Sequence, residues 1–148
     1  MEQNYDEITE RLLAAPYWVI DFLPMQVPQE SHGQFFAVEQ YYLAGERREH
    51  LWCQFADVVL GLSCYHDLTV NTGGDDWFKN PEPASLVAWL NESLLNGHLC
   101  ALIDDGAALI TASGGDTHIT LYNPSPALLD LARQLADAAG LFLWQTPT

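Results

Sequence analysis

The chain is poor in positive charge. Its 148 residues include only five Lys and Arg against 20 Asp and Glu, which gives a formal net charge of −15 at pH 7. Neither Lys nor Arg occurs between Lys79 and Arg133. Nucleic acids and anionic membranes are held largely by Lys and Arg. The sequence therefore predicts a protein that binds neither nucleic acid nor a membrane.

Phosphate-binding and cofactor motifs are also missing. The chain contains no G-x-x-x-x-G-K-[ST] loop and no G-x-G-x-x-G fingerprint. Two acidic turns, Gly73-Gly74-Asp75-Asp76 and Asp104-Asp105-Gly106, lack the ligand spacing of an EF-hand loop. We therefore expect no cofactor, and we interpret both segments as solvated turns.

Cysteine is scarce and shows no pairing pattern. Cys53, Cys64 and Cys100 make an odd number, lie in apolar stretches and form no C-x-x-C motif, which predicts free, buried thiols in a reducing compartment. Cys100, within Leu99-Cys100-Ala101-Leu102, is expected to belong to the core. The first seven residues are polar and acidic, unlike a signal peptide, and no apolar run is long enough to span a membrane. These features favour a cytoplasmic protein.

Apolar residues, in contrast, are plentiful. They make up 49% of the chain, so a sizeable core is available and a disordered chain is excluded. A length of 148 residues predicts one domain, residues 1–148.

Hydrophobic periodicity and turn residues predict an alternating order of helices and strands. We expect helices at 4–15, 34–43, 46–62, 83–95 and 126–139, and strands at 17–23, 64–70, 99–103, 107–112, 117–122 and 141–144. Tight turns at 105–106 and 114–116 predict that the three strands between 99 and 122 form an antiparallel meander. The fold class is α+β, with a mixed or mostly antiparallel sheet of about six strands and helices packed mainly on one face.

Two segments resemble each other. Asn80-Pro81-Glu82-Pro83 and Asn123-Pro124-Ser125-Pro126 each open a helix, and a glycine ends each helix before an apolar strand. Proline in the first turn and a left-handed glycine after the last turn are common capping chemistry. The likeness therefore has a local explanation, and a true repeat stays open.

One group of soft ligands is a candidate metal site. His50 and Cys53 are three residues apart on a predicted helix, and Cys64 and His66 follow it. Imidazole and thiolate are the ligands that zinc favours, but the spacing does not fit a zinc finger. We therefore expect these residues to pack normally and to hold no metal.

His66 and Asp67 are the leading candidates for acid–base chemistry. An imidazole oriented by a carboxylate can take up a proton near neutral pH. Adjacent residues of a strand point to opposite faces, however, so the two side chains would not meet if this segment is a strand. His32, in the loop at 24–33, is a further candidate, because the loop could cover a pocket lined by Trp18, Trp52, Tyr65 and His66.

The segment Asp75-Asp76-Trp77-Phe78 is the leading candidate for protein binding. Tryptophan is favoured at protein interfaces, and an exposed aromatic pair beside acids would suit a basic, partly apolar surface.

The most concrete hypothesis from these patterns is a non-catalytic protein-binding domain, of the inhibitor, immunity or adaptor kind, that covers a basic surface of another protein. Electrostatic steering would accelerate such an encounter. The alternative is a small-molecule-binding protein or enzyme that uses the aromatic and histidine pocket. A third possibility, a self-associating structural protein, would be revealed by its mass in solution.

Overall fold

A computed structural model describes residues 4–28, 30 and 32–146. Its helices are α1 (Tyr5–Leu13), α2 (Gln34–Tyr42), α3 (Gly45–Ser63), α4 (Pro83–Asn96) and α5 (Pro126–Ala138). Its strands are β1 (Tyr17–Asp21), β2 (Leu68–Asn71), β3 (Phe78–Lys79), β4 (His98–Ile103), β5 (Ala108–Ser113), β6 (His118–Tyr122) and β7 (Phe142–Trp144).

Within the described residues the strands form one seven-stranded sheet in the order β3-β2-β4-β5-β6-β1-β7. Every neighbouring pair is antiparallel, so the predicted α+β class is confirmed, with one strand more than expected.

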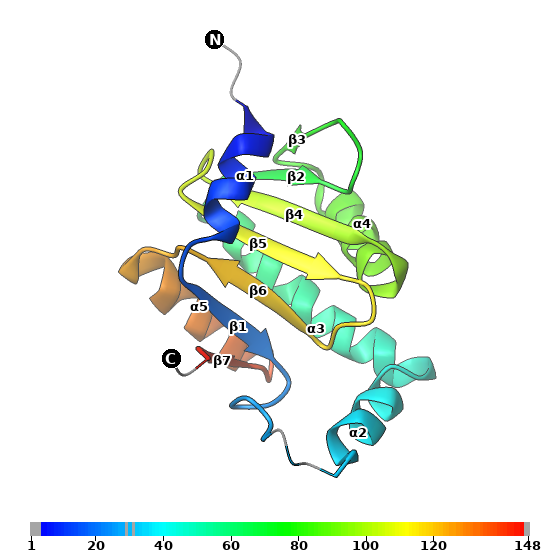
Figure 1. Ribbon diagram of the computed structural model, residues 1–148. Coiled ribbons are helices and arrows are strands. Elements are labelled where there is room, and N and C mark those ends of the chain that lie inside the picture. The colour runs from blue at the N-terminus through cyan, green and yellow to red at the C-terminus, as the bar shows by residue number, and fades with distance from the viewer. Residues whose placement is uncertain (1–3, 29, 31, 147–148) are drawn as a thin grey trace.

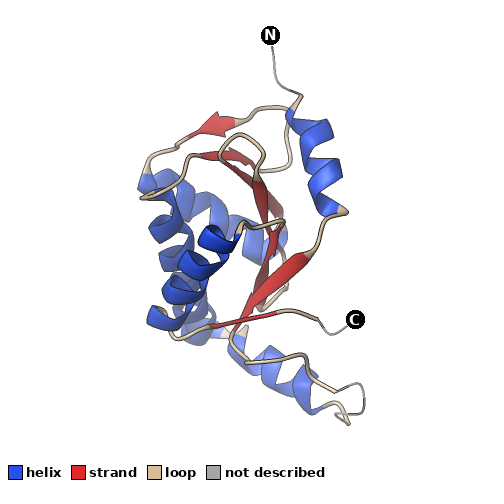
Figure 2. Cartoon of the chain, turned by 90° about the vertical axis from the view of Figure 1, so that its left-hand side faces the viewer, coloured by secondary structure: helices blue, strands red, loops and turns tan. Residues whose placement is uncertain are grey.

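The sheet separates two layers of unequal size. Helices α3, α4 and α5 cover one face, and α1 lies on the other (Figure 2). The larger core lies between the sheet and the three helices and includes Phe55, Leu90, Ile110 and Leu121. A smaller cluster of Leu12, Cys100, Leu102 and Leu109 lies under α1. The expectation that helices pack mainly on one face is therefore confirmed.

Side chains cap the starts of two helices. Asn4 Oδ1 accepts a hydrogen bond from the Glu7 amide at 3.1 Å, and this bond satisfies an otherwise unpaired N–H of α1. Ser125 Oγ accepts the Leu128 amide at 3.1 Å at the start of α5.

The predicted strand at 64–70 is wrong in its first half. Helix α3 runs to Ser63, and the amides of Tyr65 and His66 still bond to the carbonyl of Leu62, so this segment completes a helix end. The strand begins only at Leu68. The sequence does not predict β3, whose two residues pair with Thr69 and Val70.

The two similar segments occupy equivalent places in the sheet. One runs from β3 through α4 to β4, and these strands flank β2. The other runs from β6 through α5 to β7, and these strands flank β1. Asn80 and Asn123 open both crossovers in the left-handed conformation, with φ of 49° and 56°. The glycines differ, because Gly140 is left-handed whereas Gly97 is extended, so the shared capping prediction is wrong at Gly97.

Helix α2 stands apart from both layers. It projects from the end of the sheet at which α3 begins (Figure 1). None of its residues is buried. Among the described residues, no helix has the length and apolarity to cross a membrane.

Candidate functional site

Three large apolar side chains of α2 are exposed to solvent. The exposed fractions are 64% for Phe36, 42% for Val38 and 55% for Tyr41. A short surface helix ordinarily turns its large apolar side chains toward the core. These three residues, together with Arg47 and Arg48 at the start of α3, are called the α2 surface below.

The inner side of α2 ties the helix to the body by few contacts. The ring of Tyr42 lies 4.8 Å from the ring of Phe22, measured between centroids. The Thr117 hydroxyl donates to Glu39 at 3.5 Å, a long hydrogen bond. Among the described residues the helix is therefore held mainly at one side, and its outer side chains face away from the body.

Within the described part of the chain, the two arginines of the α2 surface lack carboxylate partners. The guanidinium carbon of Arg47 lies 4.4 Å from the centre of the Tyr41 ring, and that of Arg48 lies 4.9 Å from the Trp52 ring. Within residues 4–28, 30 and 32–146, the ion pairs involve only His66 and Lys79 as cations. Arg48 Nε is buried, and it has no hydrogen-bond partner among these residues. In a chain with 20 acids, such a pair of adjacent arginines is unexpected.

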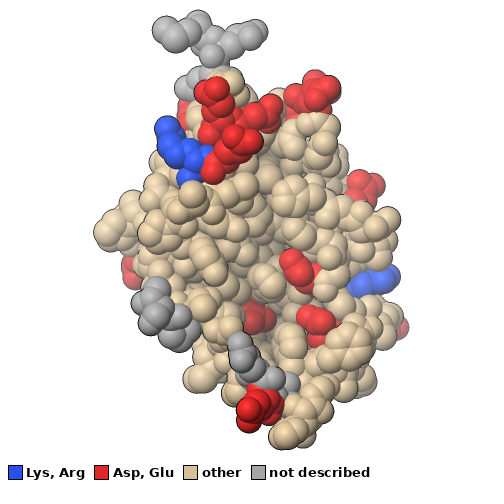
Figure 3. Space-filling model, in the orientation of Figure 1, with Lys and Arg blue, Asp and Glu red and all other residues tan. Residues whose placement is uncertain are grey.

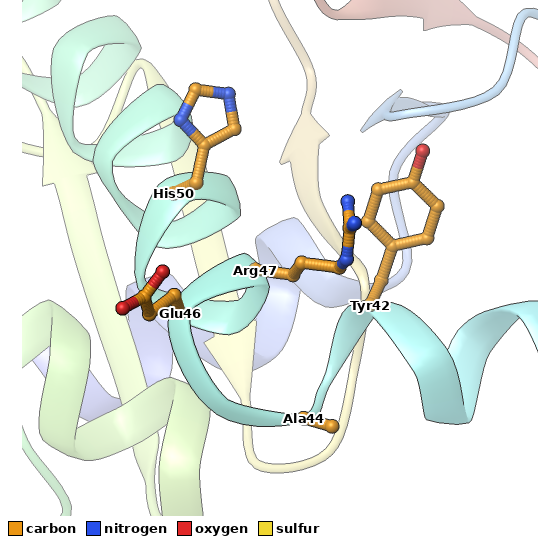
Figure 4. A pocket seen from close by; sticks show the side chains of 5 residues that line it. All are labelled: Tyr42, Ala44, Glu46, Arg47 and His50. Carbon is orange, nitrogen blue, oxygen red and sulfur yellow. The ribbon is translucent and has the colours of Figure 1, made fainter.

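A hollow of about 500 Å³ lies where α2 joins α3. Its lining residues are Tyr42, Ala44, Glu46, Arg47 and His50. Figure 4 shows that Arg47 extends from α3 toward the end of α2. The hollow therefore adjoins the α2 surface and presents both charge signs.

A second constellation lies at the opposite end of α3. His66 Nδ1 is 2.7 Å from Asp104 Oδ2. An ionised carboxylate only accepts hydrogen bonds, so the imidazole donates from Nδ1. Asp104 Oδ1 accepts the Asp67 amide at 3.1 Å, so this carboxylate is fixed at both oxygens.

A network of further bonds surrounds this pair. Asp67 Oδ1 accepts from the Asn80 amide group at 3.0 Å, and Asn80 Oδ1 accepts the Leu68 amide at 3.0 Å. Lys79 Nζ lies 3.8 Å from Asp67 and 3.6 Å from Asp105. The network joins the β4–β5 turn to the ends of β2 and β3, which gives it a structural role.

The His66–Asp104 pair also borders a small pocket of about 240 Å³. The other lining residues are Ala107, Ala108, Asn123, Pro124, Ser125 and Leu128. Because Nδ1 is bonded to Asp104, Nε2 is the ring nitrogen left to accept a proton or a ligand hydrogen bond.

The predicted catalytic residues are only partly brought together. His66 pairs with Asp104 rather than with its neighbour Asp67. His32 is exposed in its loop and does not line the pocket beside His66. Trp18 and Trp52 pack in or against the main core, and Tyr65 is 71% exposed. Residues 29 and 31 of the proposed covering loop lie outside the described residues.

Part of the predicted binding segment is exposed to solvent, and its two aromatic residues pack against other rings. Asp75 and Asp76 are exposed. Trp77 is half-buried, and its ring lies 5.3 Å from the Tyr5 ring of α1. Phe78 is 43% exposed and lies 5.1 Å from the Trp89 ring.

The soft ligands His50, Cys53, Cys64 and His66 do not gather into one site. In the described part of the chain, no three His, Cys, Asp or Glu side chains are placed to hold a metal ion. Cys53 and Cys64 are exposed, free thiols, so the prediction of buried thiols is wrong for these two.

The one buried thiol of the three, Cys100, has polar neighbours that the sequence did not indicate as a group. Cys100 Sγ lies 3.2 Å from His98 Nε2, and His98 Nδ1 lies 3.0 Å from Ser113 Oγ. Burial raises the pKa of the Cys100 thiol to about 11. The prediction that Cys100 belongs to the core is confirmed by its place under α1, and its protonated thiol is a poor nucleophile.

Sequence reasoning missed the α2 surface and Asp104. The segment QFFAVEQYY carried one signal, because its aromatic residues lie on all sides of a helix and cannot all face a core. The sequence identifies Asp104 only as a turn residue. It lies 38 positions from His66 in the chain, so no local pattern indicates that the two side chains pair.

Comparisons with known proteins found no relative of this chain. No family model matches the chain, and neither the curated proteins nor the solved structures gave a significant match.

Proposed function

We propose that the protein is a non-catalytic protein-binding domain, of the inhibitor or adaptor kind, and that α2 is its docking element. The observation that carries this proposal is a helix without a single buried residue that exposes Phe36, Val38 and Tyr41. Exposed aromatic and arginine side chains on a projecting element are the anchors from which protein interfaces draw most of their energy. An exposed apolar patch of this kind favours association.

The charge distribution supports a separation of roles on the surface. Charged side chains gather at the end of the α1-bearing face where α1 begins, and the middle of that face carries few (Figure 3). The acidic residues Asp75 and Asp76 are exposed and could steer a basic partner. The apolar contact itself would then be made by the α2 surface.

The three cysteines are free thiols. This state suits a reducing compartment, so a cytosolic location is part of the proposal.

The test compares binding by matched variants in lysate of the native cell. The Val38→Ser/Tyr41→Ala variant removes two exposed side chains of the α2 surface, and Tyr65→Ala/Leu95→Ser removes two exposed side chains elsewhere. We expect tagged wild-type protein and the control variant to retain the same protein species, and the α2 variant to lose it at least about tenfold. Equal retention by all three proteins would refute α2 docking.

A second candidate function is supported by the His66–Asp104 pocket. Its polar groups are mainly acceptors: Nε2 of His66, the Asp104 carboxylate and the side-chain oxygen of Asn123. The side-chain nitrogen of Asn123 already donates to the carbonyl of Ala107. This chemistry suits a small ligand that donates hydrogen bonds, such as a primary ammonium, and disfavours an anion.

Amide NMR of labelled protein tests this candidate with n-butylammonium, n-butanol and butyrate. Ammonium-specific shifts at Asn123 and Ser125 that disappear in Asp104→Asn would support it. Equal responses to the three probes would exclude it.

A further inference from the structure

The pocket beside His66 is small and open to the surface. Its volume is about 240 Å³, whereas pockets that enclose a whole drug-sized ligand commonly occupy about 300–1,000 Å³. Ala108 and Leu128 in its lining are buried and apolar. Asp104 and Asn123, in contrast, are exposed. The pocket therefore suits the end of a single side chain, with the rest of the molecule that carries it lying outside.

The polar groups of this pocket are acceptors that the fold holds in place. Asp104 Oδ2 lies 2.7 Å from His66 Nδ1, and Asp104 Oδ1 accepts the Asp67 amide at 3.1 Å. The imidazole therefore presents Nε2 as an acceptor. Asn123 donates its side-chain nitrogen to the carbonyl of Ala107 at 3.1 Å and keeps its side-chain oxygen as an acceptor. An ammonium group, which donates three hydrogen bonds and accepts none, matches these acceptors.

Carboxylates outnumber cations around the pocket. The only lysine of the chain, Lys79, places Nζ 3.8 Å from Asp67 and 3.6 Å from Asp105. Within the described residues, the third carboxylate, that of Asp104, has only His66 as an ion-pair partner, and a neutral imidazole supplies no charge. A further cation beside Asp104 would therefore reduce the repulsion among the three acids.

Lysine fits this environment better than arginine. A guanidinium binds a carboxylate best through two parallel hydrogen bonds, one to each oxygen. Both oxygens of Asp104 are already engaged, by His66 and by the Asp67 amide, which disfavours that arrangement. A compact ammonium needs only single acceptors. The aliphatic stem of a lysine can lie along the apolar side chains of Ala108 and Leu128.

We propose that this pocket receives a lysine side chain of a partner polypeptide, with its ammonium group at His66 Nε2, Asp104 and the side-chain oxygen of Asn123. The small volume favours one side chain over a whole metabolite. The neighbouring carboxylates of Asp67 and Asp105 favour further basic residues beside that lysine. This inference rests on the second candidate function, because it names the ligand of that pocket, and it is independent of α2.

The first experiment is an amide NMR titration of the full labelled chain. The probes are the blocked peptide Gly-Ser-Lys-Ser-Gly, its versions with trimethyllysine, arginine or norleucine in place of lysine, and n-butylammonium. Norleucine removes the charge, and trimethyllysine keeps the charge but removes the N–H donors. We expect the lysine peptide to shift Asn123 and Ser125 and to bind at least about fivefold more tightly than the other peptides. It should also bind at least about threefold more tightly than n-butylammonium, because a polypeptide makes contacts outside the pocket.

Matched variants locate the binding. Asp104→Asn and Asp105→Asn make the same charge change at adjacent left-handed positions, with φ of 51° and 59°, and of the two only Asp104 lines the pocket. The first should weaken binding of the lysine peptide at least about fivefold and the second less than about twofold. Ala107→Leu places a larger side chain in the pocket, whereas Ala127→Leu adds it at an exposed position of α5 outside the lining. Only Ala107→Leu should abolish binding, and the amide spectrum of each variant verifies that it is folded.

The outcomes separate this inference from the proposed functions. Equal affinity for the lysine and norleucine peptides would overturn both the inference and the second candidate function, and would leave α2 docking to its own lysate test. Binding of n-butylammonium as tight as that of the lysine peptide would keep an ammonium pocket but overturn the polypeptide partner. An equal loss in Asp104→Asn and Asp105→Asn would mean that the overall acidic charge attracts the peptide, which also overturns the inference.

Discussion

His66 Nδ1 lies 2.7 Å from Asp104 Oδ2, although 38 residues separate them in the chain. The contact arises because β2 and β4 pair with Leu68 opposite Ile103, so the residues just outside the two strands meet. Asp104 adopts a left-handed conformation, with φ of 51°. One side chain therefore holds an imidazole and the Asp67 amide from a backbone position that most residues avoid.

The stability of Asp104 variants should depend on whether the new residue keeps the two hydrogen bonds and whether it tolerates the left-handed backbone. Asparagine at this position keeps an acceptor and tolerates the left-handed region. Glycine loses both hydrogen bonds but adopts a positive φ without strain. Alanine loses both hydrogen bonds and is strained at this φ. We expect the free energy of unfolding to fall least for Asp104→Asn and most for Asp104→Ala, by roughly 1–3 kcal/mol. Urea unfolding would measure it, and an alanine variant as stable as the asparagine variant would contradict the assigned hydrogen bonds.

The same region shows what local pattern can and cannot predict. The helices and the meander depend on near neighbours, and the sequence predicts them to within a few residues. The pairing of His66 depends on strand register, which brings distant residues together and leaves no local signal. The sequence also predicts α2 as a helix, but its exposure depends on how the flanking loops place it, which periodicity does not report.

The exposed side chains of α2 should contribute little to folding. Val38→Ser and Tyr41→Ala should each change the free energy of unfolding by less than about 0.5 kcal/mol, because neither side chain is buried. The buried Val58 is the matched comparison, and its change to Ala should cost roughly 1–3 kcal/mol.

These measurements belong at low protein concentration, where any self-association adds little to the apparent stability. A loss above about 1 kcal/mol in either α2 variant would mean that the helix packs on the body more tightly than its exposure indicates.

The three thiols should differ sharply in reactivity. Burial raises the pKa of Cys100 to about 11, so at pH 8 only about one molecule in a thousand carries its thiolate. Cys53 and Cys64 are exposed. We expect Ellman's reagent to modify two thiols rapidly in the folded protein and the third only after denaturation.

The variant Cys53→Ser/Cys64→Ser identifies the slow thiol. It should lose the entire rapid phase and keep one thiol that appears in denaturant. A rapid phase in this variant would show that Cys100 is reached through the native fold, and that His98, 3.2 Å away, activates it.

Asp21 should make stability depend on pH in a direction opposite to that of most carboxylates. Burial raises its pKa, and the charge of His118 on the neighbouring strand opposes this effect. A raised pKa means that the folded protein favours the neutral carboxyl. The stabilising contribution is therefore present below the ordinary pKa of 3.8 and is lost as the pH rises through the elevated value in the folded protein.

The substitution Asp21→Asn imitates the neutral form at every pH. Its carbonyl oxygen can still accept the Phe22 amide, which lies 2.7 Å from Asp21 Oδ1. We expect the variant to unfold at a higher temperature than the wild type at pH 7 and at a similar temperature near about pH 3.5. Asp57→Asn, at an exposed position of α3, should show no such difference. If the wild type is the more stable protein at pH 7, the attraction between Asp21 and His118 outweighs the cost of burying the charge.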